Sequence, residues 1–215
     1  MLTEALRSLA ATWGDQFELH LVGHSAGSIF LGALLENLAQ KDMTRLVKSV
    51  HLYAPACTLA FANRYYAPHE NIMRNLYLDI LSDPRERSDN VAYLYRKSLL
   101  YFVSNALEAD VRTPILGLAN IYDTDYRGWD GSSRTAEALV NWRDAFEKYN
   151  LGERRRIHVE EKIVARKGRA MGESDKTEQA SHGGFDNNID VIGKTLERIT
   201  GSDRLAMPVL DLTAF

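Results

Sequence analysis

One five-residue segment has the residue types and the spacing that nucleophilic catalysis needs. Residues 23–27 read Gly-His-Ser-Ala-Gly, a G-x-S-x-G pattern. The apolar segment 17–22 precedes it and the helix-forming segment 26–39 follows it. The pattern therefore falls where a strand turns into a helix, which is the setting that a nucleophile elbow requires. We expect Ser25 to be the nucleophile at this turn.

The other residues of the motif have predicted roles that follow from the tight turn. Gly23 and Gly27 would remove side chains that otherwise collide with the neighbouring strand and helix. The amino end of the following helix would direct free backbone N–H groups toward the reacting carbonyl oxygen. We expect the N–H of Ala26 to be one donor of the oxyanion hole.

A nucleophilic serine needs a base, and His182 is the best candidate among six histidines. It lies in the segment Ser181-His182-Gly183-Gly184-Phe185, after the last predicted strand and before the last predicted helix. In proteins that carry such an elbow, the catalytic residues follow the order serine, acid, histidine along the chain, and this order implies that the base lies in this segment. The glycines would let the loop approach the elbow. The remaining histidines fall within predicted strands (His20, His51, His158), inside the motif (His24) or too early in the chain (His69).

The acid that would orient this base has several candidates. Asp83 directly follows the apolar segment 75–82, so it would emerge at the carboxyl end of a strand, near the elbow. We favour Asp83, with Asp89 as the alternative acid and Asp123 or Asp125 as a third option. Ser-Asp-Pro at 82–84 is also an ordinary turn sequence, so a structural role for Asp83 is the competing interpretation.

Strands that alternate with helices should hold these residues in place. Such a pattern predicts an α/β fold with a mostly parallel sheet and helices on both faces, and its sites lie at the carboxyl ends of the strands. We expect one domain over 1–215, with loop or cap insertions at 55–75 and 111–132, an exposed loop at 165–181 and a tail at 202–215. Strands are predicted at 17–22, 48–54, 75–82 and 156–164, and helices at 1–15, 26–39, 91–107, 133–149 and 187–199, the last capped by Asp186 and stopped by Gly201.

Together these segments resemble the α/β-hydrolase family, in particular its poorly characterised bacterial members. The resemblance rests on the GHSAG elbow, the strand HLYAPA, the strand and aspartate of LYLDILSD, and the late loop SHGGFDN, and it covers most of residues 15–200. It implies a serine hydrolase that cleaves an ester, thioester or amide bond through an acyl-enzyme on Ser25, with His182 as base and Asp83 as acid.

The chain departs from this family in one respect. The family has several strands before the elbow, and a loop after one of them supplies the second oxyanion donor. Here only one helix and one strand precede Ser25, so the chain resembles an N-terminally truncated hydrolase. A second copy of the chain or an upstream segment would then complete the sheet. The alternative functions are a catalytically inactive interaction domain with this fold and a fragment of a larger hydrolase.

Other features exclude further classes of function. The chain has 215 residues, 26 basic and 29 acidic side chains, and a net charge of −3, which argues against nucleic acid as a partner. No apolar window is long enough for a membrane span. Cys57 is the single cysteine, which indicates a reducing compartment, so we predict a cytoplasmic protein. The predicted partner is a small-molecule, acyl or peptide substrate. We expect no cofactor and no metal, because Arg127 and Arg134 occupy ligand positions of the only calcium-loop-like segment.

Overall fold

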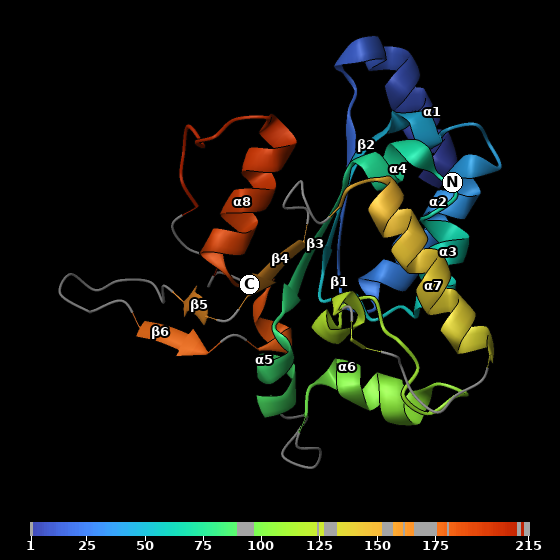
Figure 1. The fold of residues 1–215 in the computed structure, drawn as a ribbon. Helices are drawn as coiled ribbons and strands as arrows, with labels where there is room; N and C mark the ends of the chain where they lie inside the picture. Colours follow the sequence, from blue (N-terminus) through green and yellow to red (C-terminus); the bar gives the residue numbers. More distant parts are fainter. Residues whose placement is uncertain are drawn as a thin grey trace.

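Helices and parallel strands alternate along the chain (Figure 1). The computed structural model describes residues 2–89, 97–123, 125–126, 133–151, 157–160, 162–165, 176–179, 181–209 and 212. The strands are β1 Leu19–His24, β2 Val47–Tyr53, β3 Leu76–Leu81, β4 Ile157–Glu160, β5 Lys162–Ala165 and β6 Lys176–Gln179. The helices are α1 Leu2–Trp13, α2 Gly27–Ala39, α3 Leu59–Tyr65, α4 Glu70–Arg74, α5 Asp83–Ser88, α6 Leu99–Phe102, α7 Ser133–Lys148 and α8 Ile189–Thr200. Short helical turns are η1 Gly14–Gln16, η2 Thr44–Leu46, η3 Val103–Leu107, η4 Ala119–Tyr122 and η5 His182–Gly184.

A four-stranded parallel sheet in the order β1-β2-β3-β4 forms the centre of the molecule. All three pairings are parallel, and Val50 of β2 lies opposite both Leu21 of β1 and Leu76 of β3. The carboxyl ends of these strands therefore lie at one edge of the sheet. The chain is an α/β protein, as the alternation of strands and helices predicted.

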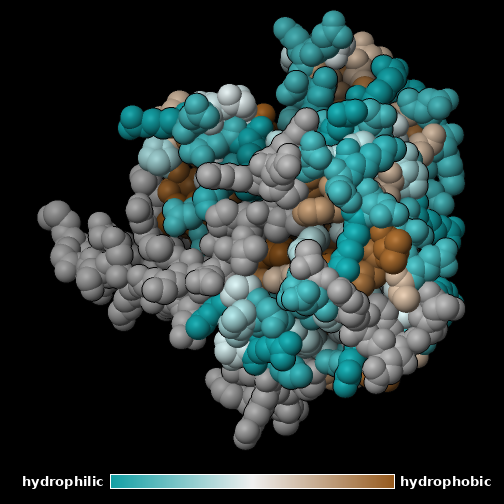
Figure 2. All heavy atoms as spheres, viewed as in Figure 1, coloured by the Kyte–Doolittle hydropathy of each residue, from teal (hydrophilic) through white to brown (hydrophobic). Residues whose placement is uncertain are grey.

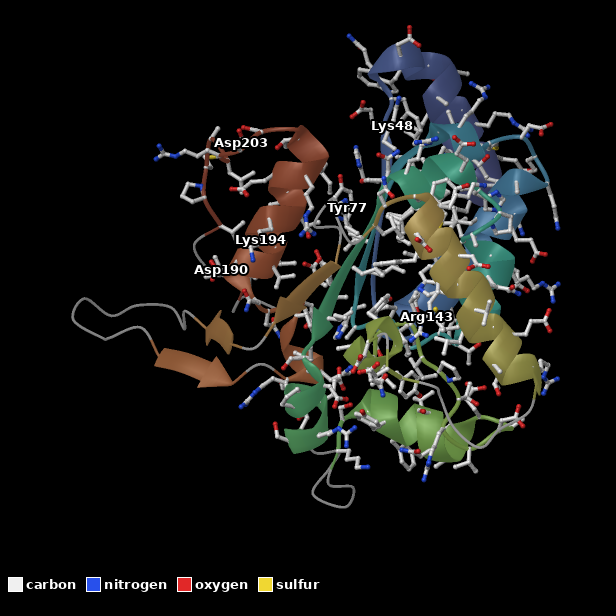
Figure 3. The ribbon with its side chains drawn as sticks, in the orientation of Figure 1. Lys48, Tyr77, Arg143, Asp190, Lys194 and Asp203 are labelled. Carbon is white, nitrogen blue, oxygen red and sulfur yellow. The ribbon has the colours of Figure 1, made fainter. Side chains whose placement is uncertain are left out.

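Helices cover both faces of this sheet. In Figure 1, α8 lies on one side of the strands, while α2, α3, α4 and α7 lie on the other. Successive side chains of a strand point to opposite faces of the sheet, so β2 contributes side chains to the packing with the helices on both faces. Tyr53 faces α8, where its hydroxyl donates to Thr195 Oγ1 at 2.6 Å, and Arg198 of α8 pairs with buried Asp79 of β3 at 2.9 Å. Figure 3 shows Tyr77 between the sheet and α8, where Arg198 covers its ring at 5.0 Å.

The hydrophobic core lies between the sheet and the layer of α2, α3 and α7. Leu35 and Leu38 of α2, Leu52 of β2, Leu59 of α3 and Trp142 of α7 are fully buried. In Figure 2 hydrophilic residues cover most of the described surface on this face. No helix in the described ranges is both long enough and apolar enough to cross a membrane.

Some predicted elements differ from those that the structure contains. Residues 55–75 hold two helices, α3 and α4, rather than an irregular insertion. The single strand predicted at 156–164 is two strands, β4 and β5, which belong to different sheets. The loop predicted at 165–181 contains β6, which pairs antiparallel with β5. The first part of the helix predicted at 91–107 falls outside the described residues, and its second part is α6 followed by η3.

Candidate active site

The turn between β1 and α2 holds Ser25 in an uncommon backbone conformation. Its φ angle is 52°, in the left-handed region that costs a residue with a side chain roughly 1–2 kcal/mol. Hydrogen bonds hold this conformation in place: the N–H of Ser25 donates to Tyr53 O at 2.8 Å, and its carbonyl accepts from Ala56 N at 3.1 Å. Strained residues that the surrounding structure fixes in this way are concentrated at functional sites. The Gly-His-Ser-Ala-Gly segment therefore forms the strained strand-to-helix turn that the sequence predicted.

Ser28 also stabilises this turn, and sequence reasoning missed it. Its side chain is fully buried, and its hydroxyl donates to Ser25 O at 2.7 Å while accepting from Cys57 N at 3.2 Å. Tyr66, the residue that directly follows α3, donates its hydroxyl to Ser28 O. A helical serine has too many structural roles for its type alone to have signalled this one.

Only one of the two motif glycines is required by close packing. A Cβ atom on Gly23 would lie 2.8 Å from Leu31 Cδ1 and 3.2 Å from the carbonyl carbon of Gly27, so α2 crosses β1 too closely for a side chain. A Cβ atom on Gly27 would meet nothing within 4 Å, so the collision expected there does not occur. Ala26 is exposed and is the N-cap of α2, where backbone N–H groups have no acceptor within the helix.

His182 lies beside Ser25, although 157 residues separate them in the chain. The distance from His182 Nε2 to Ser25 Oγ is 2.8 Å, and the histidine side chain is buried. Phe185 anchors the loop, because it is fully buried and stacks against Tyr53 with ring centroids 6.3 Å apart. A Cβ atom on Gly183 would meet nothing within 4 Å. The loop thus reaches the elbow because of its phenylalanine, and Gly183 is not needed for the approach.

His24, the variable residue of the motif, contacts the same loop. Its Nε2 donates to the backbone carbonyl of His182 at 2.8 Å, and its Nδ1 lies 3.8 Å from Asp186 Oδ2. Its ring is 5.3 Å from the ring of His182. His24 therefore positions the base, a role that its place inside the motif did not indicate. Asp186 is not the cap predicted for the last helix, because Asn188 caps α8.

The environment of His182 favours its neutral form. Burial, and to a smaller extent the nearby His24, lowers the pKa of His182 to about 4 against the opposing effects of Asp89 and Asp186. A general base must be unprotonated to accept a proton, and His182 meets that condition at neutral pH. Its Nδ1 is buried and makes no hydrogen bond with any part of the chain that the structure describes.

Asp89, and not Asp83, is the carboxylate that reaches His182. Asp89 Oδ2 accepts a hydrogen bond from the backbone N–H of His182 at 2.9 Å. Asp83 begins α5 and binds elsewhere: Arg87 Nε donates to its Oδ2 at 2.6 Å, and the Tyr101 hydroxyl donates to its Oδ1. The geometry therefore reverses our preference for Asp83. The Asp89 carboxylate contacts the main chain of His182 and not the imidazole ring. The effect of Asp89 on the ring is therefore electrostatic.

A third carboxyl group, Glu86, lies on α5 between these two aspartates. It is fully buried, and neither of its oxygens makes a hydrogen bond with a described residue. Burial, with smaller contributions from Asp89 and Asp83, raises the pKa of Glu86 to about 8. The group is therefore mainly neutral at neutral pH, and the negative charge of α5 near the site comes from the two aspartates.

None of the remaining sequence candidates is bonded to the Ser25 hydroxyl in the described part of the chain. Among the histidines, His20 Nδ1 is 2.7 Å from Ser49 Oγ, and His51 Nε2 is 2.8 Å from the same hydroxyl, so both belong to the sheet face under α8. Asp123 Oδ1 accepts from the N–H of Asp125 two residues on, as a turn residue does. The last candidate, Cys57, is buried, and burial raises the pKa of its thiol to about 12.

Neither a metal site nor the cavity at the opposite end of the sheet competes with this site in the described residues. No group of three or more histidine, cysteine, aspartate or glutamate side chains could hold a metal ion there. A cavity of about 710 Å³ lies at the amino ends of β1 and β2, with Phe17 and Lys48 among its lining residues. The elbow lies at the carboxyl ends of the same strands, so this cavity is remote from Ser25.

The burial of His182 predicts the pH dependence of any reaction that uses it as base. The acid limb of kcat/KM should be centred near pH 4, because protonation of His182 with its lowered pKa removes the base. Initial rates across the acid range would measure this, and a limb centred near 6.5 would contradict a buried base.

Folding must be followed at each of these pH values. Burial also lowers the pKa of His51, to about 3. Because the unfolded chain would bind protons that these two folded-state histidines do not, stability falls as the pH falls below about 6.5. Circular dichroism at each pH separates this loss of structure from the titration of the base.

Comparison with protein-family models, with curated proteins and with solved structures found no match to this chain.

Proposed function

We propose that the protein is a serine hydrolase of α/β-hydrolase type that cleaves an ester, thioester or amide bond through an acyl-enzyme on Ser25. The observation that carries the proposal is the 2.8 Å contact between Ser25 Oγ and His182 Nε2, with Ser25 at a φ of 52° between a strand and a helix. A serine bonded to a buried neutral histidine is the arrangement that nucleophilic catalysis needs.

The proposed reaction has two halves. In the first, Ser25 Oγ attacks the substrate carbonyl while His182 Nε2 takes the hydroxyl proton, and the tetrahedral oxyanion faces the N–H of Ala26. His182 then gives that proton to the leaving group as the C–O, C–S or C–N bond breaks, which leaves the acyl-enzyme. In the second half, His182 takes a proton from water, which attacks the acyl carbonyl, and returns that proton to Ser25 Oγ as the acid product leaves. Asp89 stabilises the positive charge that His182 carries in both transition states.

Hydrolysis of p-nitrophenyl acetate by purified protein tests this proposal. The wild-type chain should release p-nitrophenolate above the background rate, and Ser25→Ala should lower kcat by roughly 10³-fold or more because no acyl-enzyme can form. Ser49→Ala is a matched control, since Ser49 is also bonded to histidines but lies under α8. Equal rates in wild type and Ser25→Ala would contradict the proposal.

An interaction domain with the same fold is the second candidate function. The observation that favours it is the position of β1 at the end of the four-stranded sheet, where no described strand pairs with its outer edge. Val22 of this edge strand is 45% exposed. An unpaired strand edge is a template for pairing with another chain. Such a domain would not need a reactive Ser25, so the hydrolysis assay also separates the two candidates.

A further inference from the structure

A small cavity with positively charged walls lies at the same edge of the sheet as Ser25. Its volume is about 300 Å³, and it is enclosed by residues from α5, α6, η3 and the segment 119–126. Three cations, Arg87, Lys97 and Arg112, are among its lining residues, and none of the described residues that line it is acidic. The other lining residues are tyrosine, serine and asparagine, which can all form hydrogen bonds.

The charge of this cavity is only partly compensated. Asp83 lies behind Arg87, with its Oδ2 2.6 Å from the guanidinium Nε, and neutralises that one cation. Neither Lys97 nor Arg112 forms an ion pair with any carboxylate in the part of the chain that the structure describes. Cations gathered around a cleft raise the local concentration of anions. The cavity therefore favours an anionic occupant.

The walls of the cavity also carry hydrogen-bonding side chains that are held in place. Tyr101 lies between two of the cations, with Arg87 5.6 Å and Lys97 5.2 Å from its ring centre. Its hydroxyl donates to Asp83 and accepts from Asn120 Nδ2 at 3.3 Å. Asn120 Oδ1 is buried and makes no hydrogen bond with a described residue, so the wall presents the Tyr101 hydroxyl and the Asn120 amide as a polar pair.

The loop that carries Arg112 is fixed in place rather than free to turn away. Arg112 has a φ angle of 62°, a conformation that a residue with a side chain adopts only when its surroundings impose it. The next residue supplies that restraint: Thr113 N donates to Ser104 O at 3.0 Å, and Ser104 Oγ donates to Thr113 O at 2.7 Å. Arg143 of α7, labelled in Figure 3, holds the opposite wall by donating to the backbone carbonyls of Ile121 and Tyr126.

The helix α5 connects this cavity to the candidate active site. Arg87 lines the cavity two residues before Asp89, which binds the backbone of His182. Two residues span at most about 7 Å of backbone, so the residue that carries one cation of the cavity lies close to the residue that contacts the His182 loop. A substrate that reaches from the cavity to Ser25 would run along this end of α5.

We propose that this cavity is a substrate-binding subsite that holds the anionic end of the hydrolase substrate, a carboxylate or a phosphate, while Ser25 attacks the acyl carbonyl. Lys97 and Arg112 bind the anion. This inference rests on the proposed hydrolase function for its catalytic part, whereas binding of the anion does not depend on catalysis.

Binding is tested first, in the Ser25→Ala protein, so that turnover plays no part. Inorganic phosphate and glutarate, titrated separately and followed by NMR amide shifts, should perturb the amides of Lys97, Arg112 and Asn120. Lys97→Gln and Arg112→Gln should each weaken binding by about tenfold, because one charge-assisted hydrogen bond is lost.

Lys48→Gln is the matched control. Lys48 is exposed and lies at the far end of the sheet from α5 and α6 (Figure 3), so binding should be unchanged. Tighter binding of phosphate identifies a phosphorylated substrate, and tighter binding of glutarate identifies a carboxylate.

Substrate preference is tested next, in the protein with Ser25 intact. The p-nitrophenyl monoesters of glutaric, adipic and suberic acid should include one whose kcat/KM exceeds that of p-nitrophenyl butyrate by about tenfold. That ratio should fall toward one in Lys97→Gln and Arg112→Gln and persist in Lys48→Gln.

Absence of anion binding would overturn the proposed subsite. An equal loss of anion affinity in the Lys97, Arg112 and Lys48 variants would also overturn it. Anion binding without hydrolysis of any ester would overturn the proposed function and leave the cavity an anion site. Hydrolysis that prefers no charged ester would overturn the assignment of the cavity to the substrate.

Discussion

Replacing His182 by alanine should lower kcat for ester hydrolysis by roughly 10⁴- to 10⁶-fold, close to the loss expected on removing Ser25 itself. The reason is that a serine hydroxyl is a weak nucleophile until a base takes its proton, so serine and histidine act as a unit and neither works alone. The base in this chain is 2.8 Å from Ser25 Oγ, and no other histidine in the described residues is bonded to that hydroxyl. Steady-state kinetics on p-nitrophenyl acetate measure the loss.

The control for this variant is His69→Ala. His69 precedes α4 and is only partly buried, and its side chain does not cap that helix, so the change should alter kcat by less than about threefold. Because His182 is buried, thermal unfolding of the His182→Ala protein must accompany the kinetics. A folded His182→Ala protein that retains a tenth or more of wild-type kcat would contradict the assignment of the base.

The second large effect is expected at Asp89. Asp89→Asn keeps the size of the side chain and a carbonyl oxygen that can accept from His182 N, but it removes the negative charge beside the ring. Without that charge, the positive His182 that forms in the transition state loses its stabilisation, and kcat should fall by roughly 10²- to 10⁴-fold. Asp83→Asn breaks only the contacts with Arg87 and Tyr101, so we expect less than about a tenfold change in kcat for a neutral ester.

Comparison of these two variants separates the acid that the sequence favoured from the one that the structure brings to the base. A large loss in Asp89→Asn and a small one in Asp83→Asn supports the geometric assignment. The reverse pattern would return Asp83 to the role of acid, and it would imply that the contact between Asp89 and the backbone of His182 is structural alone.

The helices and strands were predictable where the local residue pattern alone determines the secondary structure. The strands β1, β2 and β3 and the helices α2, α7 and α8 all lie within three residues of their predicted bounds, since apolar runs and helix-forming stretches mark them directly. Gly201 stops α8 in a left-handed conformation with φ of 64°, as a glycine at that position suggests. The strand β6 was missed because all four of its residues, Lys176–Gln179, are polar, so the sequence has no apolar alternation there.

The candidate site was predictable in part, because motifs identify residues while contacts select among them. Ser25 and His182 were found from a pattern and from chain order, and the structure brings them together. The sequence alone could not decide whether Asp83 or Asp89 reaches His182, since both follow the same strand. The decision depends on tertiary contacts, because Arg87 and Tyr101 donate hydrogen bonds to Asp83 and hold it away from the base. His24 was missed because its bond reaches the backbone of a loop 158 residues away, which no spacing rule detects.

Covalent labelling of Ser25 is the most direct test of the account. A fluorophosphonate probe should add once to the wild-type protein, as measured by intact mass, and peptide mapping should place the adduct on Ser25. The adduct should be lost in Ser25→Ala and strongly slowed in His182→Ala, because the probe reacts only with a serine that a base has activated. An unlabelled wild-type protein, or an adduct that persists in Ser25→Ala, would contradict the central claim that Ser25 and His182 form a catalytic pair.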